Sequence, residues 1–565
     1  MLISSSFFPL KRTSLHQLVK LKFFRSLSQS CLSGWEEPTG FDTGIKVHHP
    51  LSRQKIRLIL KNECFASWYA CGPTVYDSAH IGHASCFVKF DIIQRILRKW
   101  FDINVVTAMS ITDIDKKIFK KSQNSGEDFR NISRHYEMEF YSDLNSLNVP
   151  KPIFCTRVTD YMPQIISFVG TIVNQGNAYR SEDGSVYFDT SKLSNYGKLV
   201  SIDDSAEAND DEESDKSNKH KRSVKDFALW KAHKEGEPFW ESPWGRGVPG
   251  WHIECSTMAS AIFGSNIDIH SGGIDLKFPH HENEEAQSCT YHSCKQWTNY
   301  WLHSGHLQFK GDEKMSRSLK NVMSISDMLN KYSADHFRIL CLLSPYRNSM
   351  EFSDDSMVKA IKICKKIEAF LGKCNAYING QFGHNVIIDE SSLLQALKNT
   401  KDGMRSWFCD DFNTANAMTD LMELISLTHK NFDQEIIDDN LSPVTVGRSL
   451  AVIGAIRNFV QDTIYDLGLN IAKQKITSEI SSNIDLQNRD LLFSNVVDLS
   501  VAFRRDVKNS LIKFTPDNIK EQKREFFNIS DSFRNDMRAY GILIEDHKSN
   551  SSWRFVEDNA EKSRN

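Results

Sequence analysis

The spacing of apolar residues in the first third of the chain predicts a parallel α/β unit. Residues 67–71 form a short apolar run that Gly72 and Pro73 interrupt, which indicates a buried strand. From about His80 onward, apolar residues recur at helical spacing, and residues 102–109 form a second apolar run. A strand, a helix and a strand in this order indicate a parallel sheet whose first crossover helix begins near His80.

Later parts of the chain have other patterns. Residues 158–175 predict an amphipathic helix and residues 185–189 a short strand, both of which we expect in an insertion in the sheet. After residue 355, helical spacing with little Gly or Pro continues to about residue 470 and predicts long helices. A polar break follows at 474–490, and the remaining residues are rich in Lys and Arg.

Residues 201–223 carry a run of charge without aromatic side chains. Eight acidic residues lie between Asp203 and Asp215, and four basic residues follow them. A segment this polar cannot bury enough apolar surface to fold, so we predict a disordered loop. A charged arm that contacts RNA is the alternative.

The first 35 residues predict an organelle transit peptide. No Asp or Glu precedes Glu36, whereas five Lys or Arg and eight Ser are interleaved with Leu and Phe. Basic residues interrupt each apolar run, which disfavours a secretory signal, and a disordered basic tail is the simpler alternative. We therefore predict import into the mitochondrial matrix, the chloroplast stroma or both.

Composition sets limits on the fold and on the partners. A chain of 565 residues is too long for one core and predicts about three or four domains. No run approaches the roughly 18 apolar residues that a membrane span needs, so we expect no membrane partner. With a net charge of −3, any phosphate-binding surface must be local. Twelve cysteines without a CxxC pair predict free and mostly buried thiols.

Two groups of residues suggest chemistry on a phosphate. His80 and His83 stand at the predicted start of a helix, whose exposed amides form a ready phosphate site. Gly82 between them allows a nucleotide to approach the backbone. Lys314 and Arg317 lie on a later loop, where two cations can stabilise charge on a pyrophosphate.

These stretches resemble a known family. His80-Ile81-Gly82-His83 and the segment KMSRS at 314–318 resemble the two nucleotide signatures, HIGH and KMSKS, of class I aminoacyl-tRNA synthetases. The segments CGPTVYD at 71–77, WHIEC at 251–255 and PHHENE at 279–284 resemble the cysteinyl-tRNA synthetases within that class. The resemblance extends over roughly residues 44–560, which leaves out only the leader and the acidic loop.

The resemblance implies an organellar cysteine–tRNA ligase. Such an enzyme activates cysteine with ATP, accompanied by Mg²⁺, to cysteinyl-adenylate and transfers it to the 3′ end of tRNA(Cys). The implied catalytic residues are His80, His83, Lys314 and Arg317. The implied ATP-binding residues are His80, Gly82, His83, Asp275, Lys314 and Arg317. The implied cysteine pocket contains Thr74, Trp251, His252 and His270. A monomer would suffice for this reaction.

The residues by themselves leave two candidate metal sites open. His280 and Glu284, four apart, would share a helix face and could join two distant cysteines. A rival set is closer together in sequence, and its members are Cys289, Cys294, His281 and His292. The resemblance favours the first set, because cysteinyl-tRNA synthetases place their zinc ligands at the positions of Cys71, Cys255, His280 and Glu284. It implies one Zn²⁺ per chain, which would select a thiol over the hydroxyl of serine.

Three positions depart from the family's pattern. Arg317 replaces the second lysine of the loop, Lys320 stands where a glycine is typical, and Ser85 stands where relatives often carry arginine. The charge at 317 survives, but a planar guanidinium replaces a point charge. We expect the enzyme to be active, and these departures bear on its rate and on one contact with tRNA or phosphate.

We predict an α/β fold in which a class I Rossmann-like parallel-sheet catalytic domain with an insertion precedes a helical bundle and a small C-terminal anticodon-binding domain. The segment DDFNT at 410–414 and the terminal GILIED at 541–546 also resemble the family. The predicted boundaries are 1–35 for the transit peptide, 36–296 for the catalytic domain with a connective insertion at about 115–225, 297–360 for the KMSKS-loop and stem-contact region, 361–480 for the bundle and 490–565 for the anticodon-binding domain.

Two other functions remain open from the sequence. Relatives with the same zinc core join cysteine to a small amine or amino-sugar, but they lack a C-terminal domain, so residues 490–565 count against this function. A non-catalytic RNA-binding paralogue is the second alternative. The intact HIGH and zinc positions count against it, whereas Arg317, Lys320 and Ser85 leave it open.

Overall fold

The protein is described here from a computed structural model. The described residues are 35–50, 52–200, 220–309, 322–380, 388–432, 443–471, 542–547 and 550–555, with single positions between 497 and 538. Several sequence predictions lie outside these ranges: the leader up to residue 34, the acidic stretch 201–219, the loop with Lys314, Arg317 and Lys320, and the polar break at 474–490. Most of residues 490–541 in the predicted anticodon-binding domain also lie outside them.

A five-stranded parallel sheet occupies the centre of the molecule, with the strand order β11-β10-β3-β4-β5. The predicted unit of strand, helix and strand is confirmed as β3, α2 and β4. The bounds are Phe65–Ala70 for β3, Ile81–Trp100 for α2, Asn104–Ile111 for β4, Phe154–Arg157 for β5, Ile267–Gly273 for β10 and Thr298–Ser304 for β11. This arrangement is the predicted Rossmann-like class.

Helix α2 packs against this sheet through an apolar face that its sequence predicts. Five apolar residues at helical spacing are buried on this face: Phe87, Phe90, Ile93, Ile96 and Leu97. Phe90 meets Trp68 of β3 edge to face, with ring centroids 6.0 Å apart. Arg98 and Lys99 lie in the last turn of α2, where basic side chains interact favourably with the helix dipole.

Strands β3 and β10 lie side by side where the chain changes direction. From β3 the chain continues to β4 and β5 on one side, and it returns to β10 on the other side. Gly72 follows the end of β3. Only glycine fits at this position, because a Cβ there would lie 1.8 Å from the Ser110 carbonyl oxygen. Open parallel sheets bind ligands beyond the carboxyl ends of their strands at such a point.

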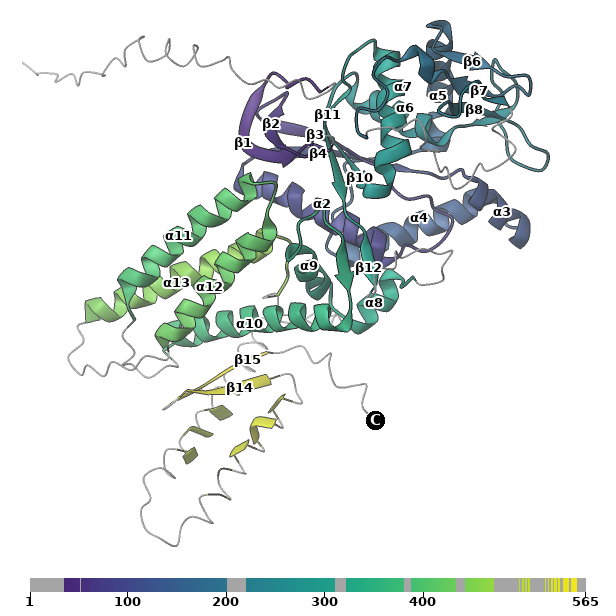
Figure 1. Ribbon diagram of the computed structural model, residues 1–565. Coiled ribbons are helices and arrows are strands. Elements are labelled where there is room, and N and C mark those ends of the chain that lie inside the picture. The colour runs from purple at the N-terminus through teal and green to yellow at the C-terminus, as the bar shows by residue number, and fades with distance from the viewer. Residues whose placement is uncertain are drawn as a thin grey trace, which may run out of the picture.

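Beyond β4, the chain builds the insertion and the helices beside the site. The four-stranded sheet β6-β7-β8-β9 is antiparallel, and it lies together with α5, α6 and α7 at one end of the molecule (Figure 1). The bounds are Lys116–Ser125 for α3, Phe129–Ser146 for α4, Met162–Asn174 for α5, Ala178–Arg180 for β6, Val186–Phe188 for β7, Phe227–Ala232 for β8, Gly247–Pro249 for β9, Trp251–Phe263 for α6 and Glu282–His292 for α7.

The predicted helix at 158–175 is confirmed except for its first turn. Val158–Tyr161 forms a separate 3₁₀ turn, and α5 begins at Met162. Pro163 stands in the first turn of α5, where its missing N–H costs nothing. The predicted strand at 185–189 is confirmed as β7.

The long helices predicted after residue 355 are confirmed, and they lie at the opposite end of the molecule from β6–β8 (Figure 1). The bounds of these long helices are Asp354–Ile378 for α10, Glu390–Cys409 for α11, Thr414–Phe432 for α12 and Pro443–Asp466 for α13. Two shorter helices precede them, α8 (Ile325–Lys331) and α9 (Ala334–Leu342). Between α2 and these helices, Arg338 of α9 is buried and pairs with Asp91 of α2 at 2.5 Å. Its guanidinium also donates to the carbonyl oxygens of Leu147 and Leu467.

The segment at 410–414 connects the helices to the N-terminal hairpin of β1 (Phe41–His48) and β2 (Lys55–Leu60). The Asp411 carboxylate accepts hydrogen bonds from the His48 N–H and from Arg347, at 3.0 and 2.8 Å. Lys55 forms an ion pair with Asp410. This segment is therefore a structural joint in this chain.

Near the C-terminus, β14 (Ile542–His547) and β15 (Asn550–Phe555) form an antiparallel hairpin that lies beside α10 (Figure 1). Val497, Val501 and Ile544 form a small core under this hairpin. Among the described residues, no helix has the length and apolar character needed to cross a bilayer.

Candidate functional site

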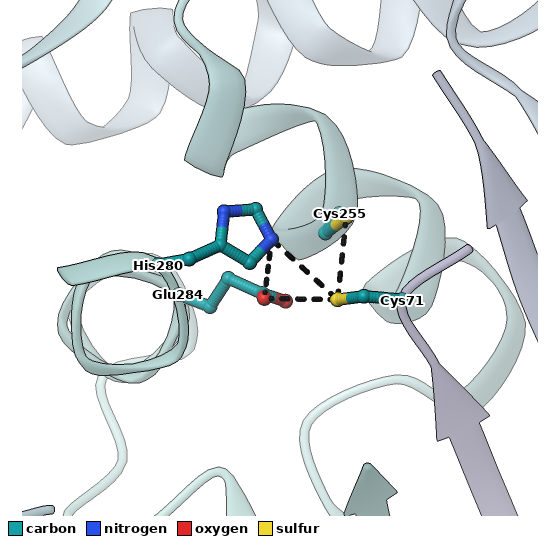
Figure 2. Close-up of side chains that lie close together, drawn as sticks. All are labelled: Cys71, Cys255, His280 and Glu284. Carbon is teal, nitrogen blue, oxygen red and sulfur yellow. Dashed lines mark hydrogen bonds and ion pairs between the residues drawn. The ribbon is translucent and has the colours of Figure 1, made fainter. Parts of the chain in front are cut away.

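Four buried side chains converge beyond the carboxyl ends of β3 and β10: Cys71, Cys255, His280 and Glu284. Figure 2 shows them pointing toward one another. Cys71 Sγ lies 3.7 Å from Cys255 Sγ, 3.5 Å from His280 Nε2 and 3.4 Å from Glu284 Oε1. One ligand atom from each residue lies within 4.8 Å of the other three, so a single ion could contact all four.

The ligand atoms come from separate elements that the sheet brings together. Cys71 follows β3 directly, and its N–H donates to the Ser271 carbonyl oxygen of β10. Cys255 lies in the second turn of α6. His280 lies in the short turn Lys277–His281, and Glu284 follows in the first turn of α7, so the two share one face as their spacing predicts.

Further hydrogen bonds orient three of these four side chains. His252 Nδ1 lies 2.9 Å from His280 Nδ1, and His270 Nε2 lies 2.9 Å from Glu284 Oε2. Ser110 Oγ lies 3.5 Å from Cys255 Sγ. Metal sites in proteins use such partners to fix the direction of their ligands. The sequence gives no signal for Ser110, because no motif surrounds it.

The electrostatics of the cluster indicate where protons reside without a metal. Burial raises the pKa of the Cys71 thiol well above its usual range, and the hydrogen bond from Cys71 lowers the pKa of Cys255 to about 5. Burial alone would lower the pKa of His280, but Glu284 and Cys255 raise it to about 10. Burial alone would raise the pKa of Glu284, but His270 and His280 lower it to about 2. Near neutral pH, protons therefore occupy Cys71 and His280, and Cys255 and Glu284 are charged.

The donor set fits a zinc ion. Two sulfurs, one imidazole nitrogen and one carboxylate oxygen are ligands that Zn²⁺ accepts, and four of them complete a tetrahedron. A second group of four overlaps with the first and contains Cys71, His270, His281 and Glu284. That group has one sulfur instead of two, and His281 Nδ1 already pairs with His303 Nε2 at 2.8 Å.

The rival metal set from the sequence is not brought together in the described part of the chain. His281 faces His303, and His292 Nε2 lies 3.0 Å from Ser260 Oγ. Cys289 and Cys294 lie at the far end of α7. Closeness in sequence therefore did not produce a four-ligand site here.

Three of the four residues predicted for the cysteine pocket, Trp251, His252 and His270, lie beside this cluster. The Trp251 ring is 39% exposed and lies 4.3 Å from the His280 ring, between centroids. His252 is buried, and burial together with His280 lowers its pKa well below the usual range, so it is neutral. His270 is buried against Trp301, with centroids 4.4 Å apart, and Thr74 pairs with Thr112 beyond β4.

His80 and His83 cap the start of α2. His80 Nδ1 accepts a hydrogen bond from the Gly82 N–H at 3.1 Å, and His83 Nδ1 accepts one from the His80 N–H at 3.2 Å. Their rings stack with centroids 3.9 Å apart. Because both Nδ1 atoms accept, both rings carry a proton on Nε2 and can donate it. A Cβ at position 82 would lie 2.8 Å from the His80 ring, which explains the glycine.

The other predicted nucleotide contacts are Asp275, Lys314 and Arg317. Asp275 is exposed in the 3₁₀ turn Ile274–Leu276, directly after β10. Lys314 and Arg317 lie outside the described residues, but residue 323, which follows their loop, accepts the Ile81 N–H at 3.1 Å. Ser85 is 1% exposed on the buried face of α2, so it adds no charge to the surface.

Comparison with known proteins gives a consistent result. The family model of the class I (C) tRNA synthetase catalytic domain matches residues 59–362. A Xenopus tropicalis protein named "Probable cysteine–tRNA ligase, mitochondrial" is 40% identical over 543 residues, which cover 93% of this chain and 91% of that protein. The cytoplasmic cysteine–tRNA ligase of Dictyostelium discoideum is 36% identical over 540 residues, which cover 92% of this chain and 79% of that protein.

Solved structures support the fold. Methionyl-tRNA synthetase of Mycobacterium tuberculosis, in complex with methionyl-adenylate, aligns with a TM-score of 0.54 at 14% sequence identity. The alignment covers 71% of this chain and 92% of that structure. At this identity the match concerns the fold, and it agrees with the predicted class I architecture.

Proposed function

Because this chain belongs to the cysteine–tRNA ligase family of class I aminoacyl-tRNA synthetases, we propose a role for each of its site residues in the reaction of that family. The protein is an ATP-dependent ligase that attaches cysteine to tRNA(Cys). The two alternatives from the sequence, ligation to a small amine or amino-sugar and non-catalytic RNA binding, are not favoured, because relatives over most of the chain are cysteine–tRNA ligases.

We propose that Cys71, Cys255, His280 and Glu284 hold one zinc ion per chain. The observation that carries this proposal is the convergence of four buried ligand atoms within 4.8 Å of one another. When bound, zinc supplies a Lewis acid that prefers a thiolate to a hydroxyl, and so it distinguishes cysteine from serine. His252 accepts the proton on His280 Nδ1, and His270 donates to Glu284, so both ligands keep one orientation.

The side chains around the cluster shape the cysteine pocket. Trp251 covers His280 from the solvent side and would form one wall. His252 and His270 are neighbours of the ligands, and we place both at the floor of the pocket. Thr74 would contact the substrate from the loop after β3. A pocket that relied on shape alone would separate cysteine from serine by only about 10²-fold.

The nucleotide would bind at the start of α2. His80 and His83 present Nε2–H donors there, and Gly82 lets a phosphate approach the backbone amides. Asp275 would bind the ribose, and Lys314 and Arg317 would close on the pyrophosphate, with Mg²⁺ accompanying ATP. These groups act by position and charge, so no covalent intermediate with the enzyme is needed.

The C-terminal residues 490–565 would bind the anticodon end of the tRNA. The support is a basic region that ends in a hairpin with Trp553, since lysines and arginines can contact phosphates and an aromatic ring can stack on a base. For the rest of the chain, we propose the domain boundaries that the sequence predicts. A monomer contains all the parts that this scheme requires.

We also propose that the protein acts in the mitochondrial matrix. The leader at 1–35 is basic, rich in serine and free of acids. The Xenopus tropicalis relative carries the word mitochondrial in its name. A fusion of residues 1–45 to a fluorescent reporter would test this, and a cytosolic reporter would overturn it.

Cysteine-dependent exchange of pyrophosphate into ATP, measured with the full chain, tests the catalytic assignment. We expect exchange with cysteine, none with serine, and charging of tRNA(Cys) in a second assay. Arg317→Ala should lower kcat by about 10²-fold with little change in the KM for cysteine. Arg317→Lys is the matched control and should retain the rate. An unchanged kcat in Arg317→Ala would remove this loop from the mechanism.

A further inference from the structure

The end of helix α7 brings together two cysteines, Cys289 and Cys294, to which the proposed reaction assigns no role. Ser293 ends the helix in the left-handed conformation, with φ of 53°. The Cys294 N–H then donates to the Cys289 carbonyl oxygen at 3.0 Å, and the Ser293 N–H donates to that of Thr290 at 3.2 Å. This pair of bonds is a Schellman motif, in which the two positions occupied here by cysteines regularly contact each other.

The two thiols line an open pocket. Its other lining residues include Lys198, Glu285 and Lys295. Cys289 Sγ donates to Glu285 Oε1 at 3.2 Å, and Lys198 Nζ lies 3.4 Å from the same sulfur. Both cysteines are half-buried, so a small molecule in solution can reach them, whereas Cys71 and Cys255 are buried.

The two thiols differ in acidity in a way that suits stepwise oxidation. The neighbouring Cys294, together with burial, raises the pKa of Cys289 far above its usual range. The neighbouring Cys289 in turn lowers the pKa of Cys294. Cys294 is therefore the better nucleophile toward an oxidant, and Cys289 holds its proton until a second step.

We propose that Cys289 and Cys294 are a thiol-oxidation site that forms a reversible disulfide with a hydroperoxide as oxidant. Cys294 releases its thiol proton, and the thiolate attacks one peroxide oxygen. The O–O bond breaks, and the leaving alkoxide takes up the released proton and departs as an alcohol, which gives a sulfenic acid on Cys294. Cys289 sulfur then attacks Cys294 sulfur, and the hydroxyl leaves with the Cys289 proton as water. Two thiols thus lose two electrons, and the hydroperoxide gains them. A dithiol restores the pair by exchange.

The geometry separates this oxidation from the metal cluster. Cys289 lies five residues after Glu284, about 7.5 Å farther along the helix axis. The motif already holds the backbone of both cysteines together, so a disulfide can form with little movement. Oxidation removes the Cys289 thiol from Glu285, while Glu285 keeps its bonds from Lys198 and from the N–H groups of Trp297 and Thr298. We therefore expect zinc to stay bound.

The test is a thiol map of the full, zinc-loaded wild-type chain after treatment with an equal amount of hydrogen peroxide. Free thiols are then alkylated with iodoacetamide, and the peptides are analysed by mass spectrometry. We expect a peptide in which Cys289 and Cys294 are both unalkylated and its mass is lower by two hydrogens. Dithiothreitol should reverse the change, and the zinc content should be unaltered.

Two variants sharpen this experiment. Cys289→Ser should stop the reaction at a sulfenic acid on Cys294, which dimedone traps. Cys155 is a half-buried cysteine elsewhere in the fold. Cys155→Ser is therefore the matched control and should leave the disulfide intact. The proposal is overturned if Cys289 and Cys294 remain alkylatable while zinc is released, or if Cys294 joins a cysteine other than Cys289.

Discussion

Two pairs of cysteines lie near α7, and they differ in almost every property. Cys71 and Cys255 are 184 residues apart in the chain, yet their sulfurs lie 3.7 Å apart in a buried cluster with His280 and Glu284. Cys289 and Cys294 are five residues apart and share one helix end at an open pocket. Contacts across the whole sheet bring the first pair together, whereas the single turn that ends α7 brings the second pair together.

The comparison teaches that closeness of two cysteines in the sequence does not by itself produce a metal site. A helix end can bring two thiols together without adding a third or fourth ligand, as Cys289 and Cys294 show. A metal cluster needs ligands from several directions, and here β3, α6 and the start of α7 supply them. Cys71 and Cys255, the distant pair, are thus suited to binding a metal. Cys289 and Cys294, the local pair, are suited to oxidation.

The largest effect we predict is a steep pH dependence of zinc binding at the distant pair. Without metal, Cys71 holds a proton because its pKa is raised, and His280 holds one because its pKa is about 10. Zinc must displace both protons, so acid favours the metal-free form and the affinity rises with pH. Two protons give roughly 100-fold per pH unit, or about 10⁴-fold from pH 6 to pH 8.

Competition with a chelator at several pH values, corrected for protonation of the chelator itself, measures this slope. A dependence of tenfold per pH unit or less would show that no more than one proton leaves, and the assignment of protons within the cluster would be wrong. The disulfide content of the local pair should not follow the same curve, because no metal ligand titrates there.

The next effect concerns the partner that orients a ligand. His270→Leu removes the hydrogen bond to Glu284 but fills a similar volume, so zinc affinity should fall by roughly 10–100-fold. His270→Gln, whose amide can still donate, should lose less. Chelator competition at one fixed pH measures both variants. Equal affinities in wild type and His270→Leu would mean that Glu284 needs no such partner.

Much of the local structure could be predicted from the sequence because its signal is short-range. The apolar period predicted β3, α2 and β4, and the bounds differ from the structure by only a few residues. The HIGH segment marked the start of α2 because a glycine and two histidines stand at a helix cap. For the metal cluster, the spacing of the residues left two sets open, and the family resemblance was needed to choose.

The remaining features depend on contacts between distant residues. Arg338 and Asp91 are 247 residues apart, and neither stands in a pattern that predicts a buried ion pair. Ser110 reaches Cys255 only because α6 packs against β4. The DDFNT segment resembled the family, but its role as a joint with His48 and Arg347 became visible only in three dimensions.

The smallest effect we predict concerns the turn that holds the local pair. Ser293 adopts φ of 53°, which costs a non-glycine residue about 1–2 kcal/mol. Ser293→Gly relieves this cost, and the greater freedom of glycine in the unfolded chain offsets part of the gain. We expect a net stabilisation of about 0.5–1 kcal/mol, seen as slower hydrogen exchange at the end of α7.

Thr290→Gly in the same helix is the control for this change. It should destabilise the helix, because glycine inside a helix is unfavourable and position 290 has no left-handed conformation to relieve. Faster exchange in Ser293→Gly would contradict the description of the turn. Zinc binding should be the same in both variants, since neither side chain touches the cluster.

The zinc content of two double variants tests the central assignment most directly. Elemental analysis should find one zinc per chain in the wild type and in Cys289→Ser/Cys294→Ser, and none in Cys71→Ser/Cys255→Ser. Circular dichroism would verify that both variants are folded. Full zinc in Cys71→Ser/Cys255→Ser, or its loss from folded Cys289→Ser/Cys294→Ser, would contradict the assignment of the metal to the distant pair.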